Sequence, residues 1–247
     1  MTNLHKTLSG ILLVLMLLVI SSASSFAGEQ SAPAINANMG VAGGAVDGDS
    51  SAVFLLSTSI PVPNGGYLQF DTLGSNQDDL DISGFGTRFF RRNPEFGLFG
   101  IKTSYLKAEP AEVYLIGLQG ELYRGMSTLS WEAGRESGDI DHAFYTRLNA
   151  RYYFTDNLSV ELGVGHELDK TYGRANLEWQ VTPIPNRFSS MALFIDASGR
   201  SHTEQILAGI RIYFGEPKSL IRRHREDSMD NTLKNSLAGI AWYNKHL

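Results

Sequence analysis

The chain of 247 residues contains no cysteine, and this absence excludes several structures at once. No disulfide can form, no lipid can be attached to a cysteine after export, and no cysteine-ligated zinc site is possible. The sequence also has no glycine-rich phosphate loop and no pattern of basic residues interleaved with aromatics. We therefore expect no nucleotide cofactor and no nucleic-acid partner.

Positive charge is in short supply, with 21 lysines and arginines against 26 aspartates and glutamates and a formal net charge of -5. One acidic run, Asp78 to Asp81, lacks the glycine and the glutamate of a calcium-binding loop. It is open to two interpretations, a solvated loop or a site for a divalent cation shared with lipopolysaccharide, and the solvated loop is favoured. We expect no metal site and no cofactor.

Long apolar runs are scarce too, and the one that stands out lies near the N-terminus, from Ile11 to Ile20. Lys6 precedes this run, and Ser25 and Ala27 supply small residues at the two positions of a cleavage site. A short apolar core with these flanks is typical of a secretory signal peptide, which we assign to residues 1–27. The alternative is an anchor helix that is not cleaved.

Beyond the leader, no stretch has the pattern of a transmembrane helix, so the exported chain is either soluble or a β-barrel. Period-2 alternation of apolar and polar residues runs through residues 67–214 in ten segments, each about as long as a tilted membrane strand, ~9–11 residues. Residues 28–66 hold two weaker runs, which predict either one more hairpin or an irregular segment inside or under the barrel. An all-β fold follows, a closed antiparallel transmembrane barrel of ten or twelve strands.

Aromatic residues gather where the predicted strands meet tight turns, and this is the strongest sign of a membrane. The set is Phe89, Phe90, Phe96, Tyr123, Tyr152, Tyr153, Phe154, Phe188, Tyr213 and Phe214. Membrane barrels carry such girdles at the lipid–water interface, whereas a soluble β-sandwich has no reason to align aromatics at one end. The girdle favours the membrane barrel.

The last strand, Gln205 to Phe214, adds a resemblance to a known class of proteins. Gly209, Ile212 and Phe214 resemble the closing-strand signal of small bacterial outer-membrane β-barrel proteins, a porin-like superfamily. The resemblance implies a location in a Gram-negative-type outer membrane, insertion by the barrel-assembly machinery, and contact with outer-membrane lipid and lipopolysaccharide.

Charged side chains alternate onto the face that the barrel pattern predicts to be inward. They are Asp71, Arg88, Lys102, Glu121, Glu132, Arg147, Arg151, Glu161, Glu167, Arg174, Glu178, Asp196 and Arg211. Such charges either line a polar pore or pair with one another across a narrow lumen. Because the interior of a barrel of ten to twelve strands is small, we favour the packed network, with at most a narrow pore.

Two classes of function remain open from the sequence. The first is a non-enzymatic barrel, either a narrow pore or a structural and interaction protein. The second is a hydrolase at the outer rim acting on lipid or peptide, for which His142, His166 and Asp141 are the candidate acid–base residues. Polar loops collect such residues in any case, so no catalytic residue is assigned and the non-enzymatic class is favoured.

Residues 215–247 differ in composition from the barrel, and we predict a partly helical extension on the periplasmic side. Leu233, Leu237 and Ile240 recur at helical spacing after Asp230, a plausible N-cap. Two locations are open to this segment, the lumen as a plug or the periplasmic face of the membrane. We predict the second, because long side chains are expected to fill the lumen. A basic cluster is then available to lipid headgroups or a periplasmic partner, or is merely solvated: Arg222, Arg223 and Arg225.

Overall fold

The computed structural model describes residues 35–62, 66–77, 80–139, 143–181, 190–201 and 203–244. The predicted signal peptide, residues 1–27, lies outside the described residues, as do Asp141 and His142. None of the described helices is long and apolar enough to cross a membrane.

Twelve strands form one closed antiparallel barrel, so the larger of the two predicted counts is confirmed. The extra pair is the N-terminal hairpin, whose strands alternate too weakly in sequence to stand out alone. The strands are β1 (Asn36–Val46), β2 (Asp49–Val62), β3 (Gly66–Gln77), β4 (Leu80–Asn93), β5 (Gly97–Ala108), β6 (Ala111–Arg124), β7 (Ser127–Gly138), β8 (Ala143–Thr155), β9 (Leu158–Glu167), β10 (Lys170–Val181), β11 (Ser190–Arg200) and β12 (Thr203–Phe214).

The barrel closes where β12 pairs with β1, in a register that runs from Phe214 opposite Ala37 to Gln205 opposite Val46. Gly209 lies opposite Ala42 in this seam, and a Cβ built on Gly209 would collide with the carbonyl group of Val41. The glycine therefore lets the first and last strands approach closely. A role of Gly209, Ile212 and Phe214 in assembly stays a prediction.

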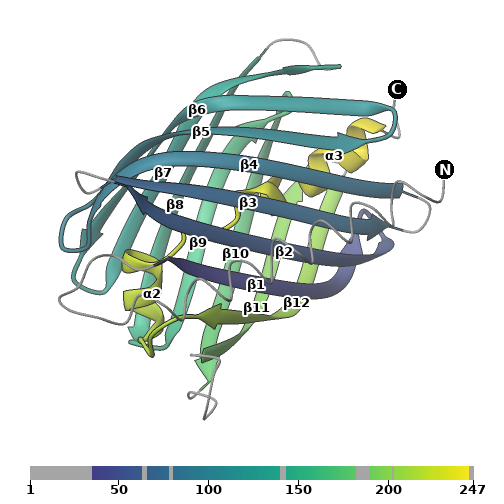
Figure 1. Cartoon of the computed structure of the whole chain (residues 1–247). Helices are drawn as coiled ribbons and strands as arrows, with labels where there is room; N and C mark the ends of the chain where they lie inside the picture. The colour runs from purple at the N-terminus through teal and green to yellow at the C-terminus, as the bar shows by residue number, and fades with distance from the viewer. Residues whose placement is uncertain are drawn as a thin grey trace, which may run out of the picture.

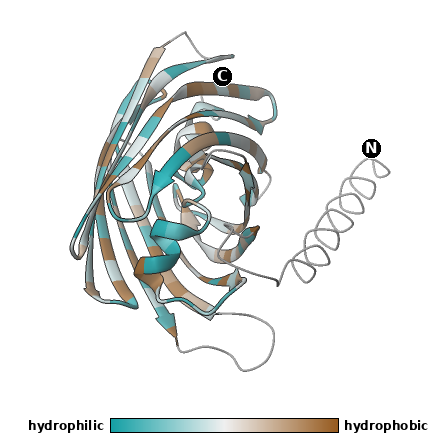
Figure 2. Cartoon of the chain, turned by 60° about the vertical axis from the view of Figure 1, so that its left-hand side comes forward, coloured by the Kyte–Doolittle hydropathy of each residue, from teal (hydrophilic) through white to brown (hydrophobic). Residues whose placement is uncertain are grey.

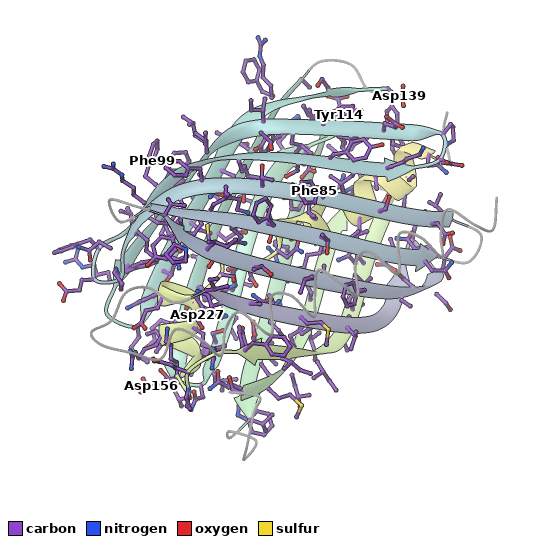
Figure 3. All side chains as sticks on the ribbon, viewed as in Figure 1. Phe85, Phe99, Tyr114, Asp139, Asp156 and Asp227 are labelled. Carbon is purple, nitrogen blue, oxygen red and sulfur yellow. The ribbon has the colours of Figure 1, made fainter. Side chains whose placement is uncertain are left out.

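The outer surface of the barrel is apolar, as a membrane requires. Leu162, Ile116 and Phe99 are 60%, 62% and 56% exposed, and brown and teal residues alternate along the strands in Figure 2. Exposed aromatics form two bands. One lies toward the end of the barrel where β1 begins and β12 ends, and consists of Phe89, Phe96, Tyr152 and Phe154. The other lies toward the opposite end and consists of Phe85, Tyr114 and Phe144. Phe85, Phe99 and Tyr114 are labelled on the outer wall in Figure 3.

Four aromatics of the predicted girdle point inward instead. Phe90, Tyr123, Tyr153 and Tyr213 are buried in the lumen. The reason is the period of the strand, because adjacent residues such as Phe89 and Phe90 cannot both face the lipid. Phe188 lies outside the described residues.

The connections at the two ends of the barrel do not sort into short turns at one end and longer loops at the other. At the end away from Asn36 and Phe214, the strands run on to residues 46 and 49, 108 and 111, and 167 and 170, which leaves two-residue turns. Asp47 and Gly48 adopt φ values of 56° and 82° there, as a tight hairpin with a primed turn requires. We take the end with Asn36 and Phe214 as periplasmic, following the topology of bacterial barrels with an even number of strands.

The C-terminal segment returns into the barrel, which makes its predicted periplasmic placement wrong. Its helices are α2 (Leu220–Glu226), η2 (Thr232–Ser236) and α3 (Leu237–Asn244). Figure 1 shows them following one another from α2 at the periplasmic end, through the interior, to α3 at the outer end. Residues of this segment, which we call the tail (residues 215–244), are almost continuously buried from Asp227 to Ala241.

Candidate functional site

The wall of the lumen carries all the charged residues that the alternation placed inward. Twelve of the thirteen are buried, and Glu121 is partly buried. Because a buried charge is costly without a partner, their pairing decides whether this wall is stable on its own.

The wall charges pair with one another, either between neighbouring strands or across one intervening strand. Arg147 lies 2.9 Å from Glu132 and 2.6 Å from Glu167, measured between guanidinium nitrogen and carboxylate oxygen. Arg174 bridges Glu161 and Asp196 at 3.2 and 2.6 Å. The remaining pairs are Arg88–Asp71, Lys102–Glu132, Arg151–Glu161 and Arg211–Glu178, each at 2.8–2.9 Å. Each of these six cations therefore has a carboxylate partner that belongs to the barrel itself.

Helix α2 is anchored to the periplasmic rim. The backbone N–H of Ile221 donates to the carbonyl of Asp156 at 3.0 Å, and Arg223 donates to the hydroxyl of Ser190 at 2.8 Å and pairs with Asp227. Asp156 and Asp227 appear at this end of the barrel in Figure 3. Arg225 donates to two carbonyls of the β6–β7 turn, those of Gly125 and Ser127. The side chain of Arg222 is 60% exposed, whereas Arg223 is buried and so is not accessible to lipid headgroups.

Asp230 is the point where the tail joins the charged network. One carboxylate oxygen lies 2.8 Å from Nη1 of Arg211 and the other lies 2.6 Å from Nη2 of Arg151. The two arginines come from β12 and β8, so this carboxylate bridges strands that do not touch each other. The sequence suggested Asp230 as a helix N-cap, whereas the structure gives it two guanidinium partners.

His224 lies beside this bridge and is held neutral. Arg151 donates to its Nδ1 at 2.7 Å, while its Nε2 lies 3.2 Å from the hydroxyl of Tyr213 and 3.5 Å from Glu178. An arginine donor at Nδ1 requires the tautomer with the proton on Nε2. Burial, together with the nearby Arg151 guanidinium, lowers the pKa of His224 below its ordinary value. The ring therefore orients α2 without adding a charge.

Further along the lumen, the tail offers hydroxyls and one ammonium group to the wall. The hydroxyl of Thr232 accepts from both Arg88 and Lys102 at 2.8 Å. Ser236 accepts from Arg147 at 3.0 Å and donates to Glu167. Lys234 reaches Asp196 at 3.1 Å. These contacts tie the tail to strands β4, β5, β8, β9 and β11.

The outer half of the lumen is apolar on the side formed by β1 to β6 and β12. Leu233, Leu237 and Ile240 of the tail are at most 2% exposed and pack there. We call their surroundings the apolar socket, formed by Val53, Leu55, Leu73, Ile82, Leu106, Val113, Leu115 and Leu207. The alternation pattern in the sequence did not predict this socket. A signal was present, because strands β2 and β6 contain the unbroken apolar runs 52–56 and 113–116, in which both faces are apolar.

Little free space remains between the tail and the charged part of the wall. A cavity of about 40 Å³ lies between tail and wall, beside Arg151, Glu161, Met229 and Asp230. A water molecule needs roughly 10–15 Å³ measured in this way, so the cavity holds a few waters at most.

The candidate catalytic residues do not form a site in the described part of the chain. His166 lies on the outward face of β9, and its Nδ1 is 3.2 Å from the hydroxyl of Thr171. His142 and Asp141, its predicted companions, lie outside the described residues. Within the described ranges, no three His, Asp or Glu side chains come together as metal ligands would.

The direction of the tail leads to a prediction about accessibility. At the outer rim, the hydroxyl of Tyr243 donates to the carbonyl of Asp139 at 2.8 Å, and Lys170 lies over the ring of Trp242. Because the chain has no cysteine of its own, a single cysteine reports one position. We expect Asn244→Cys to react with a membrane-impermeant maleimide on intact cells.

The matched control for this labelling is Arg222→Cys, at an exposed position of the same tail at the other end of the barrel. It should react only after the outer membrane has been permeabilised. Labelling of residue 222 and protection of residue 244 on intact cells would mean that the barrel is inserted the other way round.

Comparison with known structures agrees with this architecture. The KdgM porin in complex with disordered oligogalacturonate superposes with a TM-score of 0.58, at 10% identity, over 72% of this chain and 99% of that one. The COG4313 outer membrane channel from Pseudomonas putida F1 gives a TM-score of 0.54, at 10% identity, over 77% and 98%. No protein-family model and no curated protein sequence matches the chain. With its apolar outer wall, two aromatic bands and closed twelve-stranded sheet, the chain has the fold of bacterial outer-membrane porins and channels.

Proposed function

We propose that the protein is a non-enzymatic outer-membrane channel that its own tail holds closed. The observation that carries this proposal is the tail itself, which fills the lumen from the periplasmic rim at α2 to the outer rim at α3. Departure of the tail would open the lumen to a solute, and a barrel with only a structural role has no need of such a path. The known folds that this barrel resembles are channels and porins, which supports a pore.

The tail is connected to the barrel in a way that permits it to leave. It contributes no strand to the sheet, and it follows β12 through Gly215, whose φ of 106° is readily adopted only by glycine. Each of the six wall cations described above has a carboxylate partner on the wall. Departure of the tail therefore leaves the sheet intact and those wall cations paired.

Planar-bilayer conductance of the full chain and of a chain ending at Gly215 tests the proposal. We expect the full chain to conduct rarely and the shortened chain to show stable open steps, because the shortened lumen has lost the side chains that occupy it. The shortened chain should still migrate as a heat-modifiable barrel on gels. A folded, heat-modifiable shortened barrel without conductance would exclude the channel and leave the structural and interaction role.

A further inference from the structure

The lumen consists of two chemically different parts stacked along the barrel axis. The periplasmic part holds the arginines Arg151 and Arg211, four and three residues from the periplasmic ends of their strands at Thr155 and Phe214. The outer part holds the apolar socket, which begins next to the outer rim at Val46 and Ala108. The interior of a membrane barrel is ordinarily polar throughout, so the socket requires an explanation.

The periplasmic part is built as a site for one carboxylate. Arg151 and Arg211 engage different oxygens of Asp230, as two guanidiniums do when they clamp a carboxylate from both sides. Both arginines are less than a tenth exposed, and both also pair with wall carboxylates, which fix their positions. The site therefore persists when Asp230 is absent.

The outer part is built for an apolar group. Val53, Leu73, Leu106 and Val113 are at most 4% exposed and belong to one buried cluster with Leu233, Leu237 and Ile240 of the tail. If the tail left without a replacement, these side chains would face water in the lumen at a cost of about 25 cal/mol for each Å² of apolar surface. An apolar ligand in the socket removes that cost.

The tail occupies both the arginine site and the apolar socket, and the groups that it places there are those of an amphipathic acid. It presents a carboxylate, Asp230, to the arginines and an apolar body, Leu233, Leu237 and Ile240, to the socket. Between Asp230 and Leu237, the five residues of η2 alone rise by about 10 Å at the 3₁₀ repeat. An extended fatty acid of medium length covers a comparable distance.

We propose that the lumen binds an amphipathic carboxylate that enters from the cell surface and displaces the tail. Its carboxylate takes the place of Asp230 between Arg151 and Arg211, and its apolar chain takes the place of Leu237 and Ile240 in the socket. One negative charge replaces another, so the charge of the network is unchanged. This inference rests on the proposed function, since it names what opens the channel and what class of solute it carries.

The test uses the full chain in liposomes, with Ala238→Cys as a reporter and dodecanoate as the probe. Ala238 is 1% exposed, and cysteine is close to it in size, so a maleimide should react only when α3 leaves its socket. We expect dodecanoate to raise the labelling rate at least about tenfold, because a ligand that binds only the open state increases its population in proportion to occupancy. Dodecanol, which lacks the charge, and butyrate, which lacks the apolar chain, should have little effect.

Two arginine variants distinguish the site from a general effect of fatty acid on the membrane. Arg211→Gln removes one arm of the clamp and should abolish the response to dodecanoate, measured relative to the same variant without ligand. Arg222→Gln, at an exposed arginine of the tail, should keep it. An equal response to dodecanol, or a full response in Arg211→Gln, would overturn the inference.

The outcomes separate this inference from the proposed function. If the chain ending at Gly215 conducts and dodecanoate leaves the labelling of the Ala238→Cys variant unchanged, the channel stands and the amphipathic acid is wrong. If dodecanoate releases the tail but the shortened chain does not conduct, the lumen is a binding site and the channel is wrong.

Discussion

Replacement of Leu237 by aspartate should convert the closed full-length barrel into a conducting one. Leu237 is fully buried at the start of α3, in the apolar socket. The substitution removes roughly 1.5–3 kcal/mol of apolar burial. It also places a carboxylate in the socket, where an unpaired charge costs several kcal/mol more.

These two losses together approach the roughly 5.5 kcal/mol that moves a two-state equilibrium from 1:99 to 99:1. Because the socket and the sheet are unchanged in this variant, the expected result is release of α3 rather than unfolding of the barrel. Single-channel recording should show frequent open steps in Leu237→Asp, with the temperature of heat modification within a few degrees of that of the unchanged chain.

The matched control is Leu237→Met, which keeps the volume and the apolar character of the side chain. It should remain as closed as the unchanged chain. A folded Leu237→Asp barrel that conducts no more often than Leu237→Met would mean that α3 is not the closing element, even if removal of the whole tail opens the lumen.

Much of the barrel is predictable from sequence because a strand between lipid and a polar lumen must alternate. In β8, for example, Phe144, Leu148 and Tyr152 face the lipid while Arg147 and Arg151 face the lumen, as the period-2 pattern requires. The same rule places every inward charge of the set, and closure follows because a membrane tolerates no open sheet edge. The girdle was predicted less well, since proximity to a turn does not say which face an aromatic occupies.

The tail could not be placed from sequence, because that requires knowing how much of the lumen the wall leaves free. Long charged side chains gather on β7 to β12, whereas β1, β2 and β4 turn small residues inward, such as Gly40, Ser57, Ser59 and Gly86. Helices η2 and α3 contact β1, β3 to β6 and β12, away from most of the long charged side chains. A count of inward charges therefore overestimates how full the lumen is. Asp230 was likewise interpreted as a helix N-cap. Its actual partners, Arg151 and Arg211, lie on strands β8 and β12, and the sequence alone does not bring these two strands together around it.

The wall network itself should depend most on Glu132, which serves two cations. Glu132 accepts from Lys102 at 2.8 Å and from Arg147 at 2.9 Å. Arg147 also reaches Glu167, but Lys102 has no second carboxylate among the described residues and keeps only the hydroxyl of Thr232. Glu132→Gln therefore leaves the buried ammonium group of Lys102 without a carboxylate partner. We expect the free energy of unfolding to fall by about 3–5 kcal/mol, the usual cost of breaking a buried ion pair.

Urea-induced unfolding of the barrel in lipid vesicles measures this loss, and Glu112→Gln supplies the comparison. Glu112 pairs with Lys107 at 3.5 Å near the outer rim, where the side chain of Lys107 is 37% exposed. Solvent screening limits such a surface pair to about 0–1 kcal/mol. Equal losses in the two variants would show that water reaches Lys102 and Glu132 in the closed barrel, which a lumen sealed by the tail does not allow. A large loss in Glu132→Gln alone, made greater when the tail is present, would show that the tail keeps the network dry as well as closing the path.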